Sequence, residues 1–392
     1  LYFLLFVVFQ CVYKMKKILI ILTILLAFLV RFWRLDNLPA QLNIDEVAMG
    51  YSAYSILLTG HDEWGKFMPL SFASVGDYKT PIPIYLMALS EKIFGLNQFG
   101  IRFFPSLFSF LAIFVYFYIA KKYFYKHQEP VYLLLLLLSL SPWAIYFARY
   151  GYEVNELLLW FGLYLLVFFK FLTNPKPWQV FSLGTLYLIS SLTYNPAKLF
   201  IPLLSLIVWF HHTCAHKLFG NYLSLLKNPT TIVIISLLLF LFYPFFTVHL
   251  FGEGAMRARS VFISNDYEYA RVFKERLSIL PLFQLNSIFI LFSFWWQRLL
   301  EYFSPNFYLF TGLLLTSPEQ FGVGVSNLAE YVLFIIGIIS LLRQNNKQDL
   351  PIDKRMILLG WFILGLIPAS LANNPQQPLR SLVSYPAYIF IC

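Results

Sequence analysis

The segment VYLLLLLLSLSPWAIYF, residues 131–147, contains no charged side chain and no alternation of polar with apolar residues. A second segment, TTIVIISLLLFLFYPFF at 230–246, has the same character. As helices, runs of this length approach the thickness of a bilayer core. A strand of a transmembrane barrel would instead alternate between apolar and polar residues. Both segments therefore predict membrane-spanning helices.

The composition of the whole chain agrees with this prediction. The sequence has 392 residues, of which 59% are hydrophobic and only 12% charged, and its mean hydropathy is +0.68. Soluble domains carry about 25% charged residues. The formal net charge of +10 arises from small basic groups beside apolar runs, which favours membrane topology over binding of nucleic acid. We therefore expect an all-α polytopic membrane protein, surrounded by membrane lipids.

Apolar runs predict nine complete spans and the start of a tenth near residue 381. The complete spans are 15–33, 104–120, 131–147, 155–172, 178–193, 199–212, 231–248, 329–342 and 356–372. The run Met15-Lys16-Lys17 is typical of a translation start, so we expect residues 1–14 to be a spurious extension. Residues 15–392 are then one membrane domain, truncated within its tenth span.

The short run at 81–96 decides on which side each later loop lies. It begins Pro81-Ile82-Pro83 and contains Glu91 and Lys92, so we expect it to lie flat in the interface. The cytoplasmic loops then hold 14 of the 29 Lys and Arg residues, and the three short outer connections hold three. This is the bias of the positive-inside rule, and it makes the N-terminus cytoplasmic.

Two long segments, 34–103 and 249–328, lie outside in this topology. The first contains Val47, Tyr51, Tyr54, Ser55 and Leu58 at helical spacing, and the second ends in the aromatic-rich FILFSFWWQRLLEYF. Trp and Tyr concentrate at the headgroup level of membranes. We therefore expect interfacial helices in the first outer loop, and again at the end of the second.

Asp45 and Glu46 come just after the first span, where they would lie at the outer membrane surface. A carboxylate in that position can reach both a lipid-borne phosphate and a polar acceptor, and it can serve as a general base. The alternative is a helix cap, in which Asn43 or Asp45 accepts from the first N–H groups of the following helix.

Other ionisable residues fall in separate connections on the same predicted side. Arg149 and Glu153 lie in FARYGYEVNE, Tyr194 and Lys198 in LTYNPAKLF, and Arg380 in NNPQQPLRSL. Such residues at membrane depth usually mark a substrate path. Arg149 with Glu153 also fits an i,i+4 ion pair, and Lys198 a snorkelling anchor. Their convergence on one side favours a substrate site.

The order of motifs along the chain carries a family resemblance. After the first span come LDNLPAQLNIDE, DEWGKFMPLSF, GDYKTPIPIYL and FGLNQFGIRFFPSLFSFL, followed by SPWAIYFARYGYE, TYNPAKLF and PLRSLVSYP. This order resembles the C-superfold (GT-C) membrane glycosyltransferases, and within them the glycosyltransferase family 39 group of protein O-mannosyltransferases and lipid A aminoarabinose transferases. The family layout has an Asp-Glu pair, a Lys-x-Pro-like element and an Arg that opens the next helix. Here these are Asp45-Glu46, Lys79 to Pro81, and Arg102.

The resemblance implies a GT-C helical bundle of the cell envelope that acts at the outer face of the plasma membrane. It would transfer a hexose or pentose from a polyprenyl-phosphate donor to a protein, lipid or glycan, as in protein glycosylation. Asp45 would be the base of an inverting displacement, Glu46 would hold the acceptor or the local fold, and Glu153 would be a further acidic residue of the site. The residues expected to bind donor phosphate or substrate are Lys79, Arg102, Arg149, Tyr194, Lys198 and Arg380.

The sequence requires no cofactor and indicates no metal site, although a role for a divalent metal stays open. His61, Asp62 and Glu63 are adjacent, and we interpret them as a solvated turn after Gly60. The alternative function is a lipid-linked sugar flippase or secondary transporter without covalent chemistry. Transporters often show internal repeats and mid-membrane sites, whereas this sequence has no evident repeat and its carboxylates cluster outside.

Overall fold

The computed structural model describes residues 2–74, 77–125, 129–279, 286–312, 323–343, 354–373 and 377–392. This part of the chain is helical, apart from a hairpin of two short antiparallel strands, β1 (Phe72–Ser74) and β2 (Asp77–Lys79). The helices are α1 (Tyr2–Phe32), α2 (Ile44–Thr59), α3 (Pro81–Phe94), α4 (Gln98–Ile119), α5 (Glu129–Leu140), α6 (Pro142–Ala148), α7 (Glu153–Thr173), α8 (Pro177–Thr193), α9 (Ala197–His216), α10 (Phe219–Leu226), α11 (Pro229–Phe245), α12 (Glu253–Ser260), α13 (Tyr267–Ile279), α14 (Asn286–Glu301), α15 (Leu328–Arg343), α16 (Lys354–Ser370) and α17 (Tyr385–Ile391). The predicted all-α class is confirmed.

Three helices in the described ranges are long and apolar enough to cross a membrane. They comprise Gln98–Phe124, Glu153–Thr173 and Ala197–Cys214. A fourth candidate is the pair Phe219–Leu226 and Pro229–Pro244, whose helices are bent by 74°. The remaining predicted spans fall on α1, α5 with α6, α8, α15 and α16.

The predicted span 131–147 is broken into α5 and α6 at Ser141. Ser141 has φ −59° and ψ 129°, outside the helical region, because proline disfavours helical geometry in the residue before it. Pro142 then begins α6, where its missing N–H costs no hydrogen bond.

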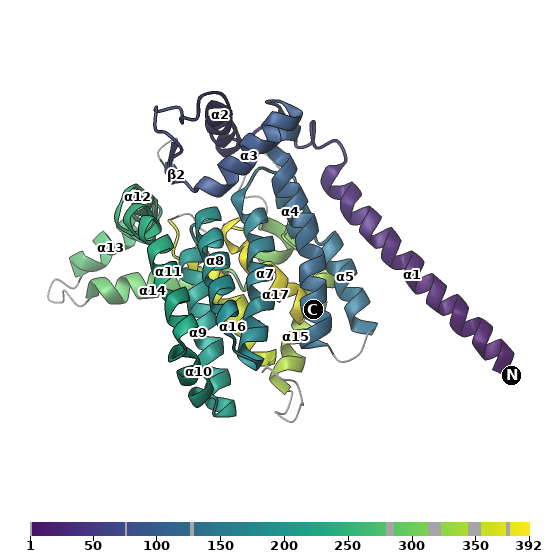
Figure 1. The fold of residues 1–392 in the computed structure, drawn as a ribbon. Coiled ribbons are helices and arrows are strands. Elements are labelled where there is room, and N and C mark those ends of the chain that lie inside the picture. Colours follow the sequence, from purple (N-terminus) through teal and green to yellow (C-terminus); the bar gives the residue numbers. More distant parts are fainter. Residues whose placement is uncertain are drawn as a thin grey trace.

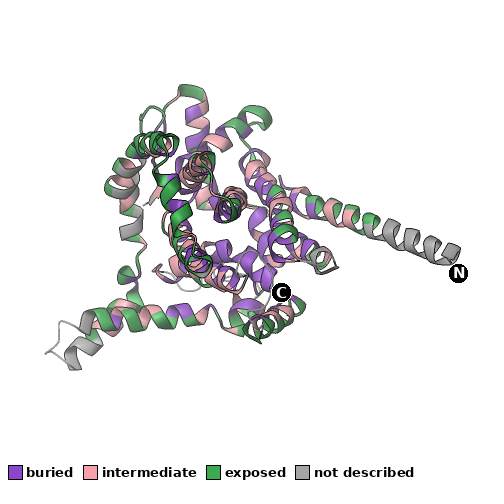
Figure 2. Cartoon of the chain, turned by 60° about the horizontal axis from the view of Figure 1, so that its bottom comes forward, coloured by how far each residue is buried: buried purple, intermediate pink, exposed green. Residues whose placement is uncertain are grey.

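The main hydrophobic core lies inside the helical bundle, with α7 packed between α4 and α8 (Figures 1 and 2). Gly162 permits the close approach of α7 to α4, because a Cβ atom there would lie 2.9 Å from Cγ1 of Val115. Trp143 and Trp361 are fully buried. The Trp143 indole donates to the carbonyl of Pro378 (3.0 Å), which meets the polar requirement of a buried indole.

Connections predicted to lie outside meet at one end of the bundle, the upper end in Figure 1. There α12 packs beside β2, and Lys66 forms an ion pair with Glu253 at 2.6 Å. The amide of Ile263 donates to the carbonyl of Leu371 at 2.8 Å. The two long outer segments therefore contact each other, and the second also contacts the connection after α16.

Connections predicted to be cytoplasmic meet at the opposite end. The carbonyl of Leu172, near the end of α7, lies 3.2 Å from Nε2 of His212 and accepts a hydrogen bond from the hydroxyl of Tyr222 at 3.1 Å. These contacts place the end of α7 beside the end of α9 and α10, as the predicted topology requires, and the side of the membrane on which they lie stays a prediction.

The chain on both sides of α3 contacts the same segment. Before α3, Lys79 forms an ion pair with Asp45, and after it, Gln98 donates to the carbonyl of Ala40 at 3.2 Å. Both ends of α3 therefore lie at the same end of the bundle, as expected of a helix that does not cross. Its position at the membrane surface stays a prediction.

Helices α2 and α3 share a small core of their own at this end. Its residues are Met49, Ala53, Ile56, Phe72, Ile84, Met87, Ala88 and Ile101. The stripe expected from the sequence lies on the other face of α2, where Val47, Tyr51 and Leu58 are 51%, 56% and 64% exposed. α2 ends at Gly60, whose φ of 72° is the left-handed geometry typical of a helix terminus.

Helix α1 runs beside the bundle and diverges from it toward the N-terminus (Figures 1 and 2). Two arginines fasten its other end. Arg31 of α1 is fully buried and donates to the carbonyl of Ser139 in α5 (2.9 Å). Arg149, after α6, donates to the carbonyls of Val30 and Trp33 at 2.7 Å each. Arg31 thus binds a carbonyl near the C-terminus of α5, and Arg149 binds carbonyls at the C-terminus of α1. The helix dipole favours a cation at both places.

Candidate active site

The first turn of α2 is capped by Asn43. Its side-chain oxygen accepts from the amide of Glu46 (2.9 Å), and the Glu46 carboxylate accepts from the amide of Asn43 (2.9 Å). This reciprocal pair is a capping box. Of the two caps considered from the sequence, the structure has Asn43 and leaves the carboxylate of Asp45 available for other contacts.

The carboxylate of Glu46 is fully buried, and both of its oxygens accept hydrogen bonds. Oε1 accepts from Nε of Arg102 and from the amide of Gly151, both at 2.8 Å. Oε2 accepts from both nitrogens of Asn43 and from Nη2 of Arg102. Among the two roles left open for Glu46, these contacts favour holding the local fold.

Arg102 joins α4 to the first outer loop. Besides Glu46, it donates to the carbonyls of Pro39 and Gln41 at 2.8 Å each. Its side chain is fully buried. These contacts anchor the first outer loop to α4. They give no support to the predicted contact between Arg102 and a donor phosphate, which stays a prediction.

Asp45 and Lys79 form the ion pair at the centre of the candidate site. Nζ of Lys79 lies 2.7 Å from Oδ1 of Asp45. The two side chains differ in exposure: Lys79 is 3% exposed and Asp45 is 41% exposed. Among the described residues, Oδ2 of Asp45 receives no hydrogen bond. The lysine therefore orients a carboxylate that remains accessible to a second molecule.

The turn between α6 and α7 lies against α2, but Arg149 points toward α1. Its guanidinium donates only to the carbonyls of Val30, Trp33 and Leu38, so the ion pair with Glu153 considered from the sequence does not form among the described side chains. Burial, together with the charge of Arg102, lowers the pKa of Arg149. Arg149 holds the start of the first outer loop.

Glu153 begins α7 and is 4% exposed. Glu156, which the sequence analysis did not select, lies one turn later and is fully buried; in the described part of the chain neither of its oxygens has a hydrogen-bond partner. The negative charge of either residue is favoured near a helix N-terminus. The i,i+3 spacing within FARYGYEVNE was the available signal for Glu156.

Tyr152 is a second residue that the sequence analysis missed. It directly precedes Glu153, and its ring packs against those of Phe147 and Tyr150. Burial raises the pKa of Tyr152, and the carboxylates of Asp45 and Glu46 raise it further. The hydroxyl of Tyr152 is therefore within electrostatic range of the acid pair.

The remaining predicted residues approach from other elements at this end. The hydroxyl of Thr80, next to Lys79, donates to the carbonyl of Thr193 (2.6 Å), which places the α8–α9 connection beside β2. Tyr194 in that connection is 4% exposed, and Lys198 donates to Asn195.

Arg380 follows the segment that contacts α6 and begins a short turn that packs against α7. Its Nη1 is buried and has no hydrogen-bond partner in the described ranges. Within the same ranges no hydrogen bond joins Asp45 to Tyr194, Lys198 or Arg380. The structure brings these residues to one end without linking them directly to the acid pair.

The residues His61 to Glu63 form a turn after α2, as expected, but only His61 and Glu63 are exposed, whereas Asp62 is buried. Oδ1 of Asp62 accepts from the amides of Trp64 (3.0 Å) and Lys66 (2.8 Å), which closes the turn. Across the described part of the chain, no group of three or more His, Cys, Asp or Glu residues is arranged to hold a metal ion.

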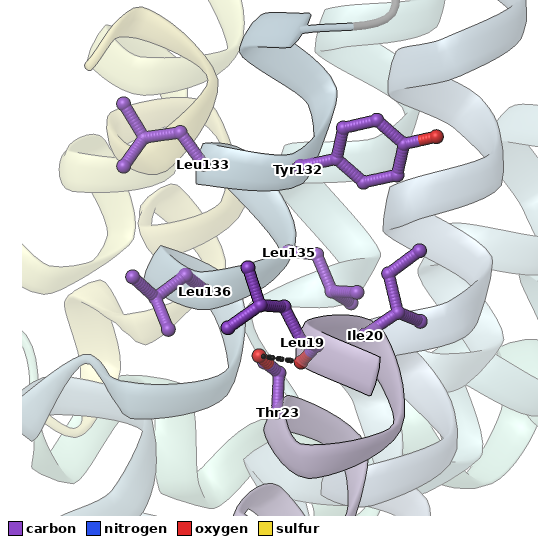
Figure 3. Close-up of a pocket in the computed structure, with 7 residues that line it drawn as sticks. All are labelled: Leu19, Ile20, Thr23, Tyr132, Leu133, Leu135 and Leu136. Atoms are coloured by element: carbon purple, nitrogen blue, oxygen red, sulfur yellow. Dashed lines mark hydrogen bonds between the residues drawn. The ribbon is translucent and has the colours of Figure 1, made fainter. Parts of the chain in front are cut away.

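A cavity of about 400 Å³ lies away from the acid pair, between α1 and α5 (Figure 3). Its lining residues are Leu19, Ile20, Thr23, Tyr132, Leu133, Leu135 and Leu136. The hydroxyl of Thr23 donates to the carbonyl of Leu19 within α1 (Figure 3). With no ionisable carboxylate or cation in its lining, this cavity is unsuited to acid–base chemistry.

The fold is that of the GT-C membrane glycosyltransferases, as the resemblance implied. ArnT from Cupriavidus metallidurans, in a crystal structure bound to undecaprenyl phosphate, matches with a TM-score of 0.57 and 15% identity over 95% of this chain and 58% of that one. The oligosaccharyltransferase of Archaeoglobus fulgidus matches with a TM-score of 0.55 and 16% identity, over 96% of this chain and 50% of that one.

The sequence also matches a family. Residues 78–245 fit the family described as dolichyl-phosphate-mannose-protein mannosyltransferase. No sequence among the curated proteins matches the chain. The chain spans about 58% of the length of ArnT and half that of the archaeal oligosaccharyltransferase, and the shared fold covers 95% and 96% of this chain.

Proposed function

We propose that this protein is an integral membrane glycosyltransferase with its active site at the non-cytoplasmic face of the plasma membrane. It transfers a hexose or pentose from a polyprenyl-phosphate donor to an acceptor hydroxyl, with inversion at the anomeric carbon. The proposal depends mainly on the surroundings of Asp45. Its side chain is 41% exposed, and its Oδ1 lies 2.7 Å from Nζ of the buried Lys79, which orients the carboxylate. A carboxylate that is fixed in place yet open to a second molecule is suited to general base catalysis.

In the proposed reaction, the Asp45 carboxylate takes the proton of the acceptor hydroxyl. The acceptor oxygen forms a bond to the anomeric carbon, while the bond between that carbon and the phosphate oxygen breaks. Polyprenyl phosphate leaves with the electron pair. Negative charge grows on the phosphate in the transition state, so a cation aimed at it accelerates the reaction.

Arg380 is the cation that best suits the leaving phosphate. Its buried Nη1 has no hydrogen-bond partner in the described part of the chain, in contrast to the occupied guanidinium groups of Arg102 and Arg149. A guanidinium can bind two phosphate oxygens at once. Lys198, at the start of α9, is the second candidate.

The proteins of the same fold support the class of donor. ArnT was solved with undecaprenyl phosphate, and the archaeal oligosaccharyltransferase AglB was solved in complex with an inhibitory peptide and a dolichol-phosphate. Both ligands are polyprenyl-type phosphates. This common feature favours a lipid-phosphate carrier here and leaves the sugar and the acceptor to experiment.

The test is a transfer assay in liposomes with a panel of radiolabelled polyprenyl-phosphate sugars. Asp45→Asn keeps the size of the side chain and removes the base, so we expect transfer to fall by about 100-fold or more. The matched control is Asp36→Asn, because Asp36 is an exposed residue of the same loop that accepts a hydrogen bond from the side chain of the adjacent Asn37. This variant should retain activity close to that of the unchanged chain.

Two outcomes would overturn the proposal. If a folded chain moves lipid-linked sugar across the bilayer without transferring it, the flippase or transporter function replaces the enzyme. If transfer occurs and Asp45→Asn is as active as Asp36→Asn, Asp45 is not the base.

A further inference from the structure

The turn at 149–153 is held directly against the acid pair. The amide of Gly151 donates to Oε1 of Glu46 at 2.8 Å. A Cβ atom at Gly151 would lie 3.2 Å from Cγ of Glu46 and equally close to side-chain atoms of Met87 and Ile101, so the approach depends on glycine. Tyr152 directly follows Gly151, and its hydroxyl lies within electrostatic range of the carboxylates of Asp45 and Glu46 in the first turn of α2.

The two tyrosines of this turn, Tyr150 and Tyr152, differ in the contacts of their hydroxyl groups. The hydroxyl of Tyr150 donates to that of Tyr146 (3.5 Å), and its ring lies 5.7 Å from the guanidinium of Arg102. The ring of Tyr152 packs at 5.5 Å from that of Tyr150 and at 6.1 Å from that of Phe147. In the described part of the chain, the hydroxyl of Tyr152 has no hydrogen-bond partner, and the side chain is partly exposed.

This combination distinguishes Tyr152 from a packing residue. A phenylalanine would make the same ring contacts, so packing alone gives no reason for a hydroxyl at this position. Polar atoms near a protein interior are normally hydrogen-bonded. A partly exposed ring that packs against two aromatic neighbours, with a hydroxyl that has no partner in the described part of the chain and lies near a candidate base, is suited to a ligand that has both apolar and hydroxyl groups.

Resting on the proposed function, we propose that Tyr152 contacts the transferred sugar and contributes to its selection. One face of a sugar ring presents C–H groups, which pack on the electron-rich face of an aromatic ring. The hydroxyl of Tyr152 hydrogen-bonds to a sugar hydroxyl. The contact holds the sugar beside Asp45, and the carrier phosphate does not take part in it.

The test measures binding and needs no transfer. Equilibrium binding of undecaprenyl phosphate carrying each of a panel of hexoses and pentoses is compared with that of undecaprenyl phosphate alone, in the absence of acceptor. The readout is the ratio of the two affinities. Tyr152→Leu removes both the ring contact and the hydroxyl hydrogen bond, so we expect it to lower this ratio by about fivefold to 100-fold. Tyr152→Phe keeps the ring and removes only the hydroxyl, so it should lower the ratio less, by about threefold to tenfold.

The control is Tyr118→Leu, at the opposite end of the bundle, where the ring is 50% exposed. It should leave both affinities unchanged. If Tyr152→Leu and Tyr152→Phe weaken bare undecaprenyl phosphate as much as the sugar-bearing form, Tyr152 has only a structural role and the inference fails. It also fails if the unchanged chain binds no member of the panel more tightly than the bare carrier.

These results remain distinct from failure of the proposed function. A chain that prefers sugar-bearing carrier through Tyr152 but transfers nothing supports the contact and contradicts the enzyme. A chain that transfers sugar with an unaltered preference in both variants supports the enzyme and contradicts the contact.

Discussion

Asp45 and Glu46 are adjacent in the chain, yet they have different surroundings because successive residues of a helix project about 100° apart. Glu46 faces inward to Arg102 and Gly151, whereas Asp45 remains at the edge of α2 beside Lys79. The capping box adds to the difference, since it turns Glu46 back onto the start of its own helix. Glu46 therefore stabilises the fold, whereas Asp45 remains available for the proposed chemistry.

The buried pair predicts a large loss of stability for Glu46→Gln. The variant leaves the guanidinium of Arg102 buried without its countercharge, and breaking a buried pair in this way costs about 3 to 5 kcal/mol. Thermal unfolding in detergent measures the effect. The control is Glu253→Gln, which removes an exposed ion pair with Lys66 and should cost about 1 kcal/mol or less. Equal losses in the two variants would contradict this account of Glu46.

At the residue scale, the sequence could locate the acid pair but could not separate its roles. Asp45, Glu46 and Lys79 lie in recognisable motifs. The partner of Glu46 is 56 positions away, and nothing local indicates that pairing. Tyr152 was missed because the sequence has 26 tyrosines, and only its position beside Gly151 separates it from the others.

Helix α3 contains a carboxyl group in unusual surroundings. Glu91 is 3% exposed, and in the described part of the chain neither of its oxygens has a hydrogen-bond partner. Gly50 of α2 lies against it, since a Cβ atom there would be 3.4 Å from Oε1 of Glu91. Both ends of α3 lie at the same end of the bundle, so we expect this group to lie outside the membrane-spanning segments. Burial raises the pKa of Glu91 to about 8.

The raised pKa of Glu91 predicts a pH-dependent stability. Between pH 4.5 and about 8 the folded chain holds a proton that the unfolded chain has lost, so stability falls as the pH rises through this window. Glu91→Gln removes this ionisation, so its unfolding temperature should fall less from pH 5 to pH 9 than that of the unchanged chain. Each pKa unit corresponds to about 1.4 kcal/mol, so the advantage of the variant at pH 9 is on the order of a few kcal/mol.

The control for this prediction is Glu268→Gln, on an exposed residue of α13 that pairs with Arg271. It should show the same pH profile as the unchanged chain. A profile of Glu91→Gln that still falls between pH 5 and pH 8 in parallel with the unchanged chain would show that another group causes the dependence.

The positions of the helices could be predicted from the sequence where runs of apolar residues define them. Runs of apolar residues located the helices of the bundle, and the pattern of α2 identified its exposed stripe. Hydrophobicity does not reveal where a span bends, however. The break at Ser141 depends on Pro142, and the 74° bend between α10 and α11 depends on the turn that joins them.

At the scale of the whole molecule, the two groups of loops make a prediction about sidedness. Trp64 and Tyr267 are 67% and 80% exposed and lie in the two outer segments, whereas Lys121 is exposed after α4. Single cysteines at these positions, with the natural cysteines replaced, can be labelled in intact cells with an impermeant maleimide. We expect labelling at 64 and 267, and labelling at 121 only after permeabilisation.

This experiment also tests the position of α3. If α3 crossed the membrane, the chain would cross twice between residues 64 and 121, and these two cysteines would label from the same side. Labelling of 64 and 267 from opposite sides would contradict the contact between the outer segments that Lys66 and Glu253 form.

The arginine contacts that fasten α1 have a consequence for the order of synthesis. Arg31 binds a carbonyl 108 positions later, and Arg149 reaches back 119 positions to Val30. At about 5 to 20 residues per second, a ribosome needs roughly 5 to 25 seconds to make the intervening chain. During that time the charge of Arg31 lacks the carbonyl of Ser139 that binds it in the finished fold. Docking of this end of α1 therefore follows the synthesis of α5 and α6, and this part of the bundle is completed only once the chain has reached Arg149.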